Sequence, residues 1–401
     1  MKRQSAVQFN SDKELSEYLL STVGSNLKQA IKTTIEVMLK LEMQELREDM
    51  EQKFQERERL YFNGSYNRHL VSPAGTIRNI AVPRFRGGND GMPIQGMQLF
   101  EDEKQRFFDL IAQMHLRGMS QQKIATLCKE YFGKKVSKNK VGKVYRELVE
   151  QESFQINEQQ LDDDYMLLVV DGIWEKVYTS RIDGETNKMV MLCVLGIRAS
   201  GERKILGFQL AKTESMEEWL LLLQSIKKRG INGNYLSLII CDGAEGSIGA
   251  LDHVYPGKPL QLCLAHKVRN VMSKVSHKYK KAVGEDFSRI YHANNLDEAK
   301  QYCKDFEKRW FVISEKAVRS LKHRFEMYFT FFQYDPQLWK TIRTTNVLER
   351  EFREVRRRTK VFDNYFQSPD SANRYHNGIF TYLNNHYPQR DSVMQNLHTV
   401  C

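Results

Sequence analysis

The sequence predicts a mixed α/β protein in which one central sheet forms the main domain, preceded by a mainly helical region that contains a small β-hairpin. Three observations lead to this prediction. Strand-like apolar runs begin near residue 165, a single amphipathic helix interrupts them, and helical spacing returns from about residue 265. Antiparallel-looking strands followed by a crossover helix and further strands are typical of an α/β domain.

Composition limits the class of protein. The chain has 401 residues, 41% hydrophobic and 28% charged, which is enough apolar material for two or three packed domains. Fibrous, disordered and membrane-spanning classes are disfavoured, because no run approaches the ~18–20 apolar residues of a membrane helix. The first twenty residues also lack the apolar segment of a secretory signal.

Charge and cysteine usage point to a polyanionic partner in a reducing compartment. The formal net charge is +11, and nucleic acid is the commonest partner of such a basic chain. The six cysteines include no Cys-x-x-Cys pair, so neither a disulfide framework nor a four-cysteine zinc site is expected.

The N-terminal third predicts helix, hairpin and then short helices. Residues 11–58 keep helical apolar spacing, with a break expected at Gly24, and fit a packing or oligomerisation helix. Turn residues at 63–64 and 73–75 predict a β-hairpin within 60–96.

Residues 101–150 contain the signals of a helix-turn-helix. Ser120 is placed to cap one short helix, Gly133 to end it, and Ser137 to cap the next. The second helix is basic and resembles the helix that such motifs present to DNA, although an ordinary helical hairpin fits the same pattern. Its candidate DNA-binding residues are Lys138, Lys140, Lys143 and Arg146.

The central region reads as strands with one helix among them. The strand-like runs are 166–174 and 175–182, which abut and could form one bent strand, then 188–198, 203–211, 236–241 and 260–266, with a helix over 216–229 before the run at 236–241. A ribonuclease H-like core has this order, but so do other mixed α/β folds.

Two acidic residues directly follow apolar strands. Asp171 comes after the run 166–170 and Asp242 after 236–241, and a glycine follows each of them. Acids at the ends of neighbouring buried strands can converge on a metal ion, because glycine lets the chain turn there. Asp-Gly is also a common turn pair, so each position alone has a structural explanation.

A third acid lies in the arginine-rich segment 344–361. Asn346, Glu349, Arg350, Arg353 and Arg357 share one broad helical face. Such a helix can bring a carboxylate to a metal while its arginines hold phosphates, or it can be a surface helix with Glu–Arg pairs.

Cys263 and His266 form half of a zinc-site motif, and no second half stands nearby, so zinc is not expected. The pair can also be explained as a packed cysteine with a hydrogen-bonded histidine.

Trp310 lies in the helical stretch that follows residue 265. We expect it to be a core residue, and the alternative is a residue that stacks on a base. Glu245 competes with Asp242 for a metal role.

These motifs together resemble the Mutator-type transposases, including their bacterial insertion-sequence branch, over roughly residues 15–385. The resemblance lies in strand-Asp-Gly, strand-Cys-Asp-Gly-Ala, Cys-x-x-His followed by Arg-Asn, and Thr-Asn-x-x-Glu-Arg before a basic run. It implies a DDE triad of Asp171, Asp242 and Glu349 in a ribonuclease H-like catalytic core interrupted by an all-helical insertion. It also suggests that Cys263, His266 and Asn346 support the active site.

The resemblance further implies an order of domains from the N-terminus to the C-terminus. The expected parts are an N-terminal helical or oligomerisation region at 1–60, a small β-hairpin region at 61–100, a helix-turn-helix-like DNA-binding domain at 101–155, the first part of the core at 160–264, the all-helical insertion at 265–338, and the last part of the core with the Glu349 helix and a C-terminal tail at 339–401.

The implied activity is that of a DNA transposase. It would bind the terminal inverted repeats of its own element, cut at the ends, and join them to target DNA with two Mg²⁺ ions, for which Mn²⁺ could substitute. A homodimer or larger assembly, no membrane association, and a bacterial cytoplasmic location at the nucleoid are expected. The residues expected on DNA phosphates are Lys267, Arg269, Arg350, Arg353, Arg357 and Arg358, besides those of the basic helix. The alternative is a catalytically inactive, sequence-specific DNA-binding regulator derived from a transposase.

Overall fold

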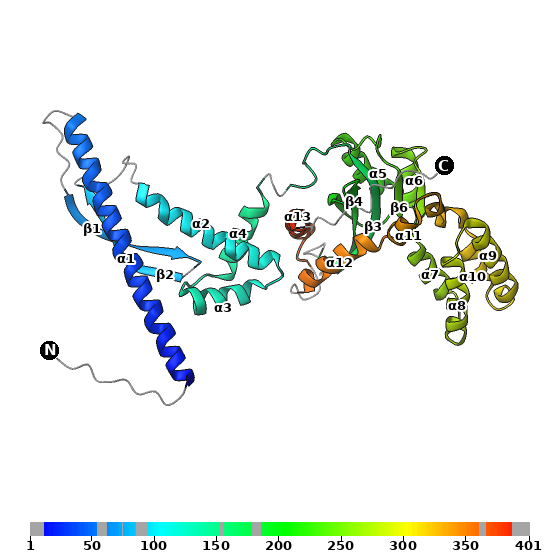
Figure 1. Ribbon diagram of the computed structural model, residues 1–401, viewed down its shortest axis with the longest axis horizontal. Coiled ribbons are helices and arrows are strands. Elements are labelled where there is room, and N and C mark those ends of the chain that lie inside the picture. The colour runs from blue at the N-terminus through cyan, green and yellow to red at the C-terminus, as the bar shows by residue number, and fades with distance from the viewer. Residues whose placement is uncertain are drawn as a thin grey trace. The chain divides into compact units, whose positions relative to one another are not determined.

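The computed structural model describes residues 12–53, 62–73, 75–85, 95–151, 155–178, 186–360 and 366–386. The chain divides into two compact units (Figure 1). The first comprises residues up to His115 together with Ser120–Tyr145, and the second comprises Leu116–Met119 and everything from Arg146 onward. The ends of the chain, including the predicted tail beyond residue 386, lie outside the described residues.

A long helix and a β-hairpin form one part of the first unit. Helix α1 (Asp12–Lys53) runs through Gly24 without the expected break, and β1 (Phe62–Ser72) pairs antiparallel with β2 (Gly75–Phe85). The predicted hairpin is therefore present. Apolar residues of α1, both strands and the following helix share one core, formed by Ile35, Leu39, Met43, Leu70, Ile77, Ile80, Val82 and Phe100.

Three further helices follow: α2 (Gln95–Leu116), α3 (Gln121–Phe132) and α4 (Lys138–Val149). The caps are those the sequence predicts. Ser120 accepts from the N–H of Lys123, Gly133 ends α3 in the left-handed conformation at φ 62°, and Ser137 Oγ accepts from the N–H of Lys140. The two short helices are therefore present with the caps that the sequence predicted.

The second unit is built on a five-stranded sheet, which confirms the predicted mixed α/β class. Its strands are β3 (Tyr165–Tyr178), β4 (Thr186–Arg198), β5 (Arg203–Ala211), β6 (Leu238–Cys241) and β7 (Leu260–Leu262). Their order in the sheet is β5-β4-β3-β6-β7. The first three are antiparallel, whereas β6 and β7 run parallel to β3.

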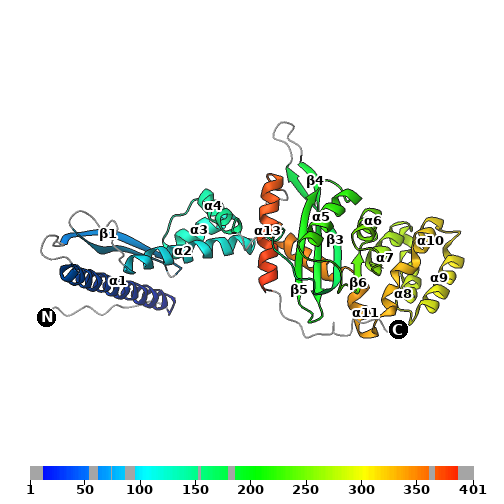
Figure 2. The same cartoon turned by 90° about the horizontal axis from the view of Figure 1, so that it is seen from above.

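Helices cover both faces of this sheet (Figure 2). Consecutive strand residues point to opposite faces. On β5, Phe208 packs against rings of α13 (Pro369–His386), while neighbouring Gly207 lies against Ile226 of α5 (Met216–Lys228). Helices α5 and α13 therefore sandwich the sheet, and its strand residues are almost entirely buried.

Between β7 and the arginine-rich helix the chain is helical throughout residues 264–342, apart from short turns (Figure 1, yellow-green to orange). The elements are α7 (Leu264–Ser273), α8 (Lys280–Tyr291), α9 (Leu296–Trp310), α10 (Glu315–Lys322), three short 3₁₀ turns and α11 (Pro336–Ile342), after which α12 (Asn346–Thr359) begins. Trp310 is 3% exposed, and its indole N–H donates to Asp286. The preferred prediction of a core tryptophan is thus confirmed.

Within the described residues, no helix is long and apolar enough to cross a membrane. The five described cysteines are buried free thiols.

Candidate active site

The two aspartates occupy matching positions on neighbouring parallel strands, although β3 does not end at Asp171 as the sequence predicted but continues to Tyr178. Strand β6 pairs in parallel with β3 as far as Cys241 opposite Val170, so Asp171 and Asp242 each come one residue after the last paired position. Asp171 is 4% exposed, and its Oδ1 accepts from the N–H of Gly172 at 2.8 Å. Asp242 therefore directly follows its strand as predicted, whereas Asp171 is an inner residue of β3 and pairs with Cys193 of β4.

Helix α12 brings Glu349 to the same place. One ligand atom each of Asp171, His266 and Glu349 lies within 4.8 Å of the others. His266 Nε2 is 3.9 Å from Glu349 Oε1, and Arg269 donates to both Glu349 oxygens at 2.9 and 3.2 Å. Residues from β3, α7 and α12 thus converge, although 178 positions separate Asp171 from Glu349 in the sequence.

The electrostatics of this cluster favour a cation. Burial, with a smaller contribution from the charge of Asp242, raises the pKa of Asp171 to about 6, against the opposing effects of His266 and of hydrogen bonds from Thr345 and Gly172. A carboxylate in this position is poorly solvated and lies close to another carboxylate. A bound cation would relieve both penalties.

Cys263 and His266 anchor the end of β7 to the start of α12. The N–H and the hydroxyl of Thr345 both donate to Cys263 Sγ, at 3.3 and 3.4 Å. Burial raises the pKa of the Cys263 thiol, but interaction with His266 and Thr345 outweighs burial and lowers it overall. The same interaction with Cys263 raises the pKa of His266 to about 9, against the effect of its burial. Among the described residues this pair completes no zinc site.

Asp242 is held from the start of helix α6 (Glu245–Val254). Its Oδ1 accepts from the N–H of Ala244 and from the hydroxyl of Ser247, each at 3.0 Å. The competing residue Glu245 points elsewhere and pairs with Arg324. Asp242 lies outside the 4.8 Å group, but its charge raises the pKa of Asp171, so it belongs to the same electrostatic site.

Glu214 is a fourth acidic residue near the site, and the sequence pattern did not predict it. It is half-buried in the loop between β5 and α5, and burial, together with the charge of Asp242, raises its pKa. A Cβ atom at Gly172 would lie 3.4 Å from Glu214 Oε1, so the glycine lets this carboxylate approach β3. The available signal was weak, because Glu214 stands three residues after its strand rather than directly after it.

The predicted phosphate-binding residues divide into exposed and buried groups. Arg269, Arg350, Arg353 and Arg357 are exposed, although Arg269 is paired with Glu349 and Arg357 with Glu354. Asn346 is also exposed, at the first position of α12.

Two of these predictions are corrected. Lys267 is 4% exposed and donates to the carbonyls of Ser320 and His323, and Arg358 is 3% exposed and donates to the carbonyl of Leu116. Each side chain donates hydrogen bonds to backbone carbonyls of segments that are distant in the sequence, so no neighbouring part of the sequence indicated these contacts. Neither side chain is available to a DNA phosphate.

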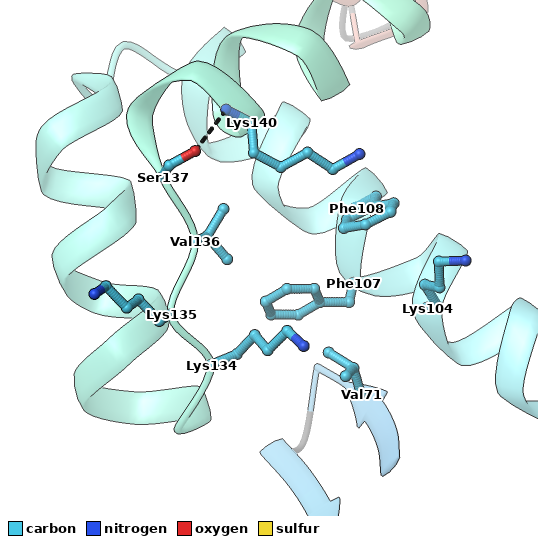
Figure 3. Close-up of a pocket in the computed structure, with 9 residues that line it drawn as sticks. All are labelled: Val71, Lys104, Phe107, Phe108, Lys134, Lys135, Val136, Ser137 and Lys140. Atoms are coloured by element: carbon cyan, nitrogen blue, oxygen red, sulfur yellow. Dashed lines mark hydrogen bonds between the residues drawn. The ribbon is translucent and has the colours of Figure 1, made fainter. Parts of the chain in front are cut away.

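Lysines and aromatic rings gather around the α3–α4 turn. Lys138, Lys143 and Arg146 are exposed on α4, and Lys140 lies 4.5 Å above the ring of Phe108. Figure 3 shows the pocket of about 450 Å³ beside them, to which Lys104, Lys134, Lys135 and Lys140 contribute basic side chains and β1, α2 and the turn contribute apolar ones. Basic side chains therefore gather around an apolar pocket in this part of the chain.

The donor set fits a hard divalent cation. Mg²⁺ prefers carboxylate oxygens. Asp171, Asp242 and Glu349 offer such oxygens close together. His266 lies beside them, and its pKa of about 9 makes it a cationic neighbour rather than a ligand at neutral pH.

Comparison with known proteins gives the class of this chain. Residues 2–390 match the family described as "Transposase, Mutator family". The chain is 28% identical over 298 residues to the "Transposase for insertion sequence element IS905" of Lactococcus lactis, covering 74% of this chain and 73% of that one. It is 26% identical over 379 residues to the "Transposase for insertion sequence element IS256 in transposon Tn4001" of Staphylococcus aureus, covering 92% and 90%.

The chain therefore belongs to the Mutator family of transposases, as its motifs indicated. Among solved structures, it is similar to a chain of the "Drosophila P element transposase strand transfer complex", with 13% identity and a TM-score of 0.29, over 73% of this chain and 83% of that chain. A similarity of this size carries no argument about the site.

Proposed function

We propose that this protein is a DNA transposase that binds the terminal repeats of its own element, cleaves at the ends and transfers the strands through a two-metal DDE site. One observation carries the proposal: in a chain of the Mutator transposase family, Asp171 and Glu349 converge from distant segments, with Asp242 at the adjacent strand end.

The proposal includes the identity of the core. Three antiparallel strands followed by two parallel ones, in the order β5-β4-β3-β6-β7, support a ribonuclease H-like core. The helical stretch 264–342 is then the insertion between its second and third acidic residues.

We assign Asp171, Asp242 and Glu349 as the residues that would hold the metal ions, with His266 beside them. When bound, divalent cations supply charge neutralisation for the attacking and leaving oxygens of a phosphodiester. In the first reaction water attacks the phosphodiester and a 3′-hydroxyl leaves. In the second, that hydroxyl attacks a phosphodiester of the target strand, and again one P–O bond forms as another breaks.

The chain's own residues prepare this site. Arg269 holds the Glu349 carboxylate with two hydrogen bonds, and Ser247 and Ala244 hold that of Asp242. His266, whose pKa is raised to about 9, is cationic at neutral pH and offsets part of the negative charge near the phosphate.

DNA binding is assigned to two basic surfaces, each within one unit. The α3–α4 pair presents Lys138, Lys140 and Lys143, and α12 presents Arg350 and Arg353. Contacts of this kind give affinity for the backbone, whereas sequence choice needs contacts with base edges. Because two element ends must be processed together, we propose a homodimer or larger assembly.

The test uses the purified full-length protein, Mg²⁺ and DNA that carries the gene with its own flanking sequence. We expect defined 3′-hydroxyl ends at both flanks, followed by joined products. Asp171→Asn, Asp242→Asn and Glu349→Gln should each abolish cutting and leave binding to the flanks unchanged.

Two results would contradict the proposal. Strand transfer retained in all three amide variants would remove the triad assignment. Binding to the flanks by the unmodified protein without any cut, in Mg²⁺ and in Mn²⁺, would favour the DNA-binding regulator instead.

A further inference from the structure

The turn between α9 and α10 presents three consecutive apolar side chains to solvent (Figure 1). Phe311 is 44% exposed, Val312 is 95% exposed and Ile313 is 46% exposed, and we call these three residues the apolar tip. Single exposed apolar residues are ordinary on a protein surface, whereas a contiguous group of them marks an interaction site. The apolar tip belongs to the second unit, and neither of the two basic surfaces assigned to DNA above includes it.

The apolar tip is held firmly at both of its ends. Trp310, directly before it, is buried, and its indole N–H donates to Asp286 of α8 at 2.7 Å. Ser314, directly after it, caps α10 by accepting from the N–H of Ala317. The Ser314 hydroxyl also donates to the carbonyl of Lys274 at 2.8 Å. The three apolar side chains therefore project from a fixed base.

A basic segment lies beside the apolar tip. Residues 274–281, which join α7 to α8, contain no acidic residue. The exposed lysines of this segment are Lys274, Lys278, Lys280 and Lys281. The ring of Tyr279 lies 5.9 Å from that of Trp310, which brings the segment against the base of the tip. In the part of the chain that the structure describes, none of the four lysines forms an ion pair, so their charges are available to a ligand.

Charge and area favour DNA over a protein as the partner of the apolar tip. The acidic residues nearest to it in the sequence, Glu307 and Glu315, are already paired with Lys322 and Arg319. A standard protein interface buries roughly 800 Å² on each partner, which three side chains cannot supply. DNA needs no such area, because proteins that kink a duplex insert a few apolar side chains between base pairs while cations hold the phosphates.

Helix α7 connects the apolar tip with the candidate active site. It carries His266 near its start, and Lys274, whose carbonyl holds Ser314, directly follows its last residue. The eight positions from His266 to Lys274 correspond to about 12 Å along a helix axis. This is the length of about three to four base-pair steps. One duplex can therefore contact both the active site and the tip.

We propose that the apolar tip inserts between base pairs of a duplex and kinks it, while Lys274 and Lys278 hold the phosphates beside the kink. The inference rests on the proposed function, since it takes DNA as the ligand, and it adds a third contact surface that favours bent DNA over straight DNA. Insertion costs the stacking energy of one base step, so the tip selects positions where the duplex is easily deformed.

Affinity for pre-bent DNA tests the proposal. The full-length protein is titrated in chelator with a straight duplex of one flank of the gene, and with a set of duplexes that carry a short bulge at successive positions. A bulge at the kink removes the cost of unstacking, so we expect one narrow range of bulge positions to raise the affinity about tenfold. Energy transfer between dyes at the two ends of the straight duplex should rise on binding, because a kink brings the ends together.

Variants separate insertion from a structural role. The triple variant Phe311→Ser, Val312→Ser and Ile313→Ser should lose the preference for the bulged duplex and the bend. Val312→Ser alone changes a side chain that is almost fully exposed, so it should lose part of both without any change in the unfolding midpoint, and Val312→Ile should keep both. Leu221→Ser, an exposed apolar residue on α5, is the matched control. Lys274→Gln should lower the salt slope by about one unit and keep the preference for the bulge.

The proposal is overturned if the triple variant keeps the preference for the bulged duplex, or if the unmodified protein binds every bulged duplex as it binds the straight one. It is also overturned if the triple variant has a lower molar mass in solution than the unmodified protein, because the tip would then contact a second copy of the chain. The assay needs no catalysis: bending without any cutting of the flanking DNA in Mg²⁺ would refute the transposase proposal alone, and cutting without bending would refute the insertion alone.

Discussion

Asp171 is a buried carboxylate, and its negative charge lowers the stability of the folded protein when no cation is bound. Its carboxylate is almost fully buried, it accepts a hydrogen bond from Gly172, and it lies in the field of Asp242. Such a residue is maintained for what it binds rather than for the stability it provides. This difference between function and stability can be measured.

We expect Asp171→Asn to stabilise the protein in chelator while it abolishes cutting. Burial and the charge of Asp242 raise the pKa of Asp171 from 3.8 to about 6. Between these values the folded state binds more protons than the unfolded state, so stability falls as pH rises and stays lower above pH 6. Near pH 7 the variant should gain roughly 1–3 kcal/mol in free energy of unfolding.

Urea unfolding in chelator from about pH 2.5 to pH 8 measures this gain. The difference between the variant and the unmodified protein should shrink as the pH falls and disappear only below about pH 3, where the Asp171 carboxyl is protonated in both states. Asp252→Asn, an exposed aspartate on α6, is the control and should show no such pH dependence. A variant that is less stable than the unmodified protein near pH 7 would contradict the assignment of Asp171 as a strained ligand.

Single residues also show what the sequence could and could not predict. The place of Asp242 was predictable, because an apolar strand followed by an acid is a local pattern, whereas β3 continues through Asp171 instead of ending there. The place of Glu214 was not predictable, because its approach to β3 depends on packing between the β5–α5 loop and Gly172. Lys267 and Arg358 were misassigned for the same reason: the carbonyls that accept from them belong to distant segments.

At the scale of elements, the start of α12 is fixed by one sulfur atom. The N–H and hydroxyl of Thr345 both donate to Cys263 at the end of β7, and Glu349 follows one helical turn later. The junction between β7 and α12 therefore sets the position of the third acid.

We expect Cys263→Ala to destabilise the protein by about 1–3 kcal/mol, because the buried N–H of Thr345 loses its acceptor. Cleavage should fall ten- to a hundredfold as Glu349 shifts. Cys263→Ser keeps an acceptor and should recover much of both losses. Unfolding midpoints and cleavage rates measure the two effects, and equal behaviour of the alanine and serine variants would exclude the acceptor role.

The end of α3 gives a test of the first unit. Gly133 has φ 62°, and a Cβ atom there would meet nothing within 4 Å, so a substitution would act through backbone conformation alone. We expect Gly133→Ala to cost about 1–2 kcal/mol in free energy of unfolding. Gly133→Asn should cost less, since asparagine tolerates the left-handed region. Equal stability of the alanine variant and the unmodified protein would show that α3 does not end at this residue.

The elements were largely predictable, and the site only in part. Apolar residues that repeat every two residues predicted the hairpin and the strands, and those that repeat every 3.6 residues predicted the helices. The break expected at Gly24 did not occur, because glycine inside a long helix costs only about 1 kcal/mol. The meeting of Asp171, His266 and Glu349 depends on how β3, α7 and α12 pack, which no local pattern records.

At the scale of the whole molecule, the charge of +11 predicts DNA affinity that falls steeply with salt. Each cation that contacts a phosphate adds nearly one unit to the slope of log affinity against log salt concentration. The exposed arginines of α12 should therefore contribute to this slope, whereas the buried cations Lys267 and Arg358 should not.

We expect Arg350→Gln and Arg353→Gln each to lower the salt slope by about one unit, and to weaken binding equally for all sequences. Lys267→Gln should leave the slope unchanged and lower the unfolding midpoint instead, because its ammonium is used by two carbonyls. Lys316→Gln, an exposed lysine on α10, changes the net charge by the same amount and controls for long-range attraction. Binding isotherms at several salt concentrations give the slopes. If Lys316→Gln lowers the slope as much as Arg350→Gln does, the DNA is held by the overall charge of the chain, and α12 is not a contact surface.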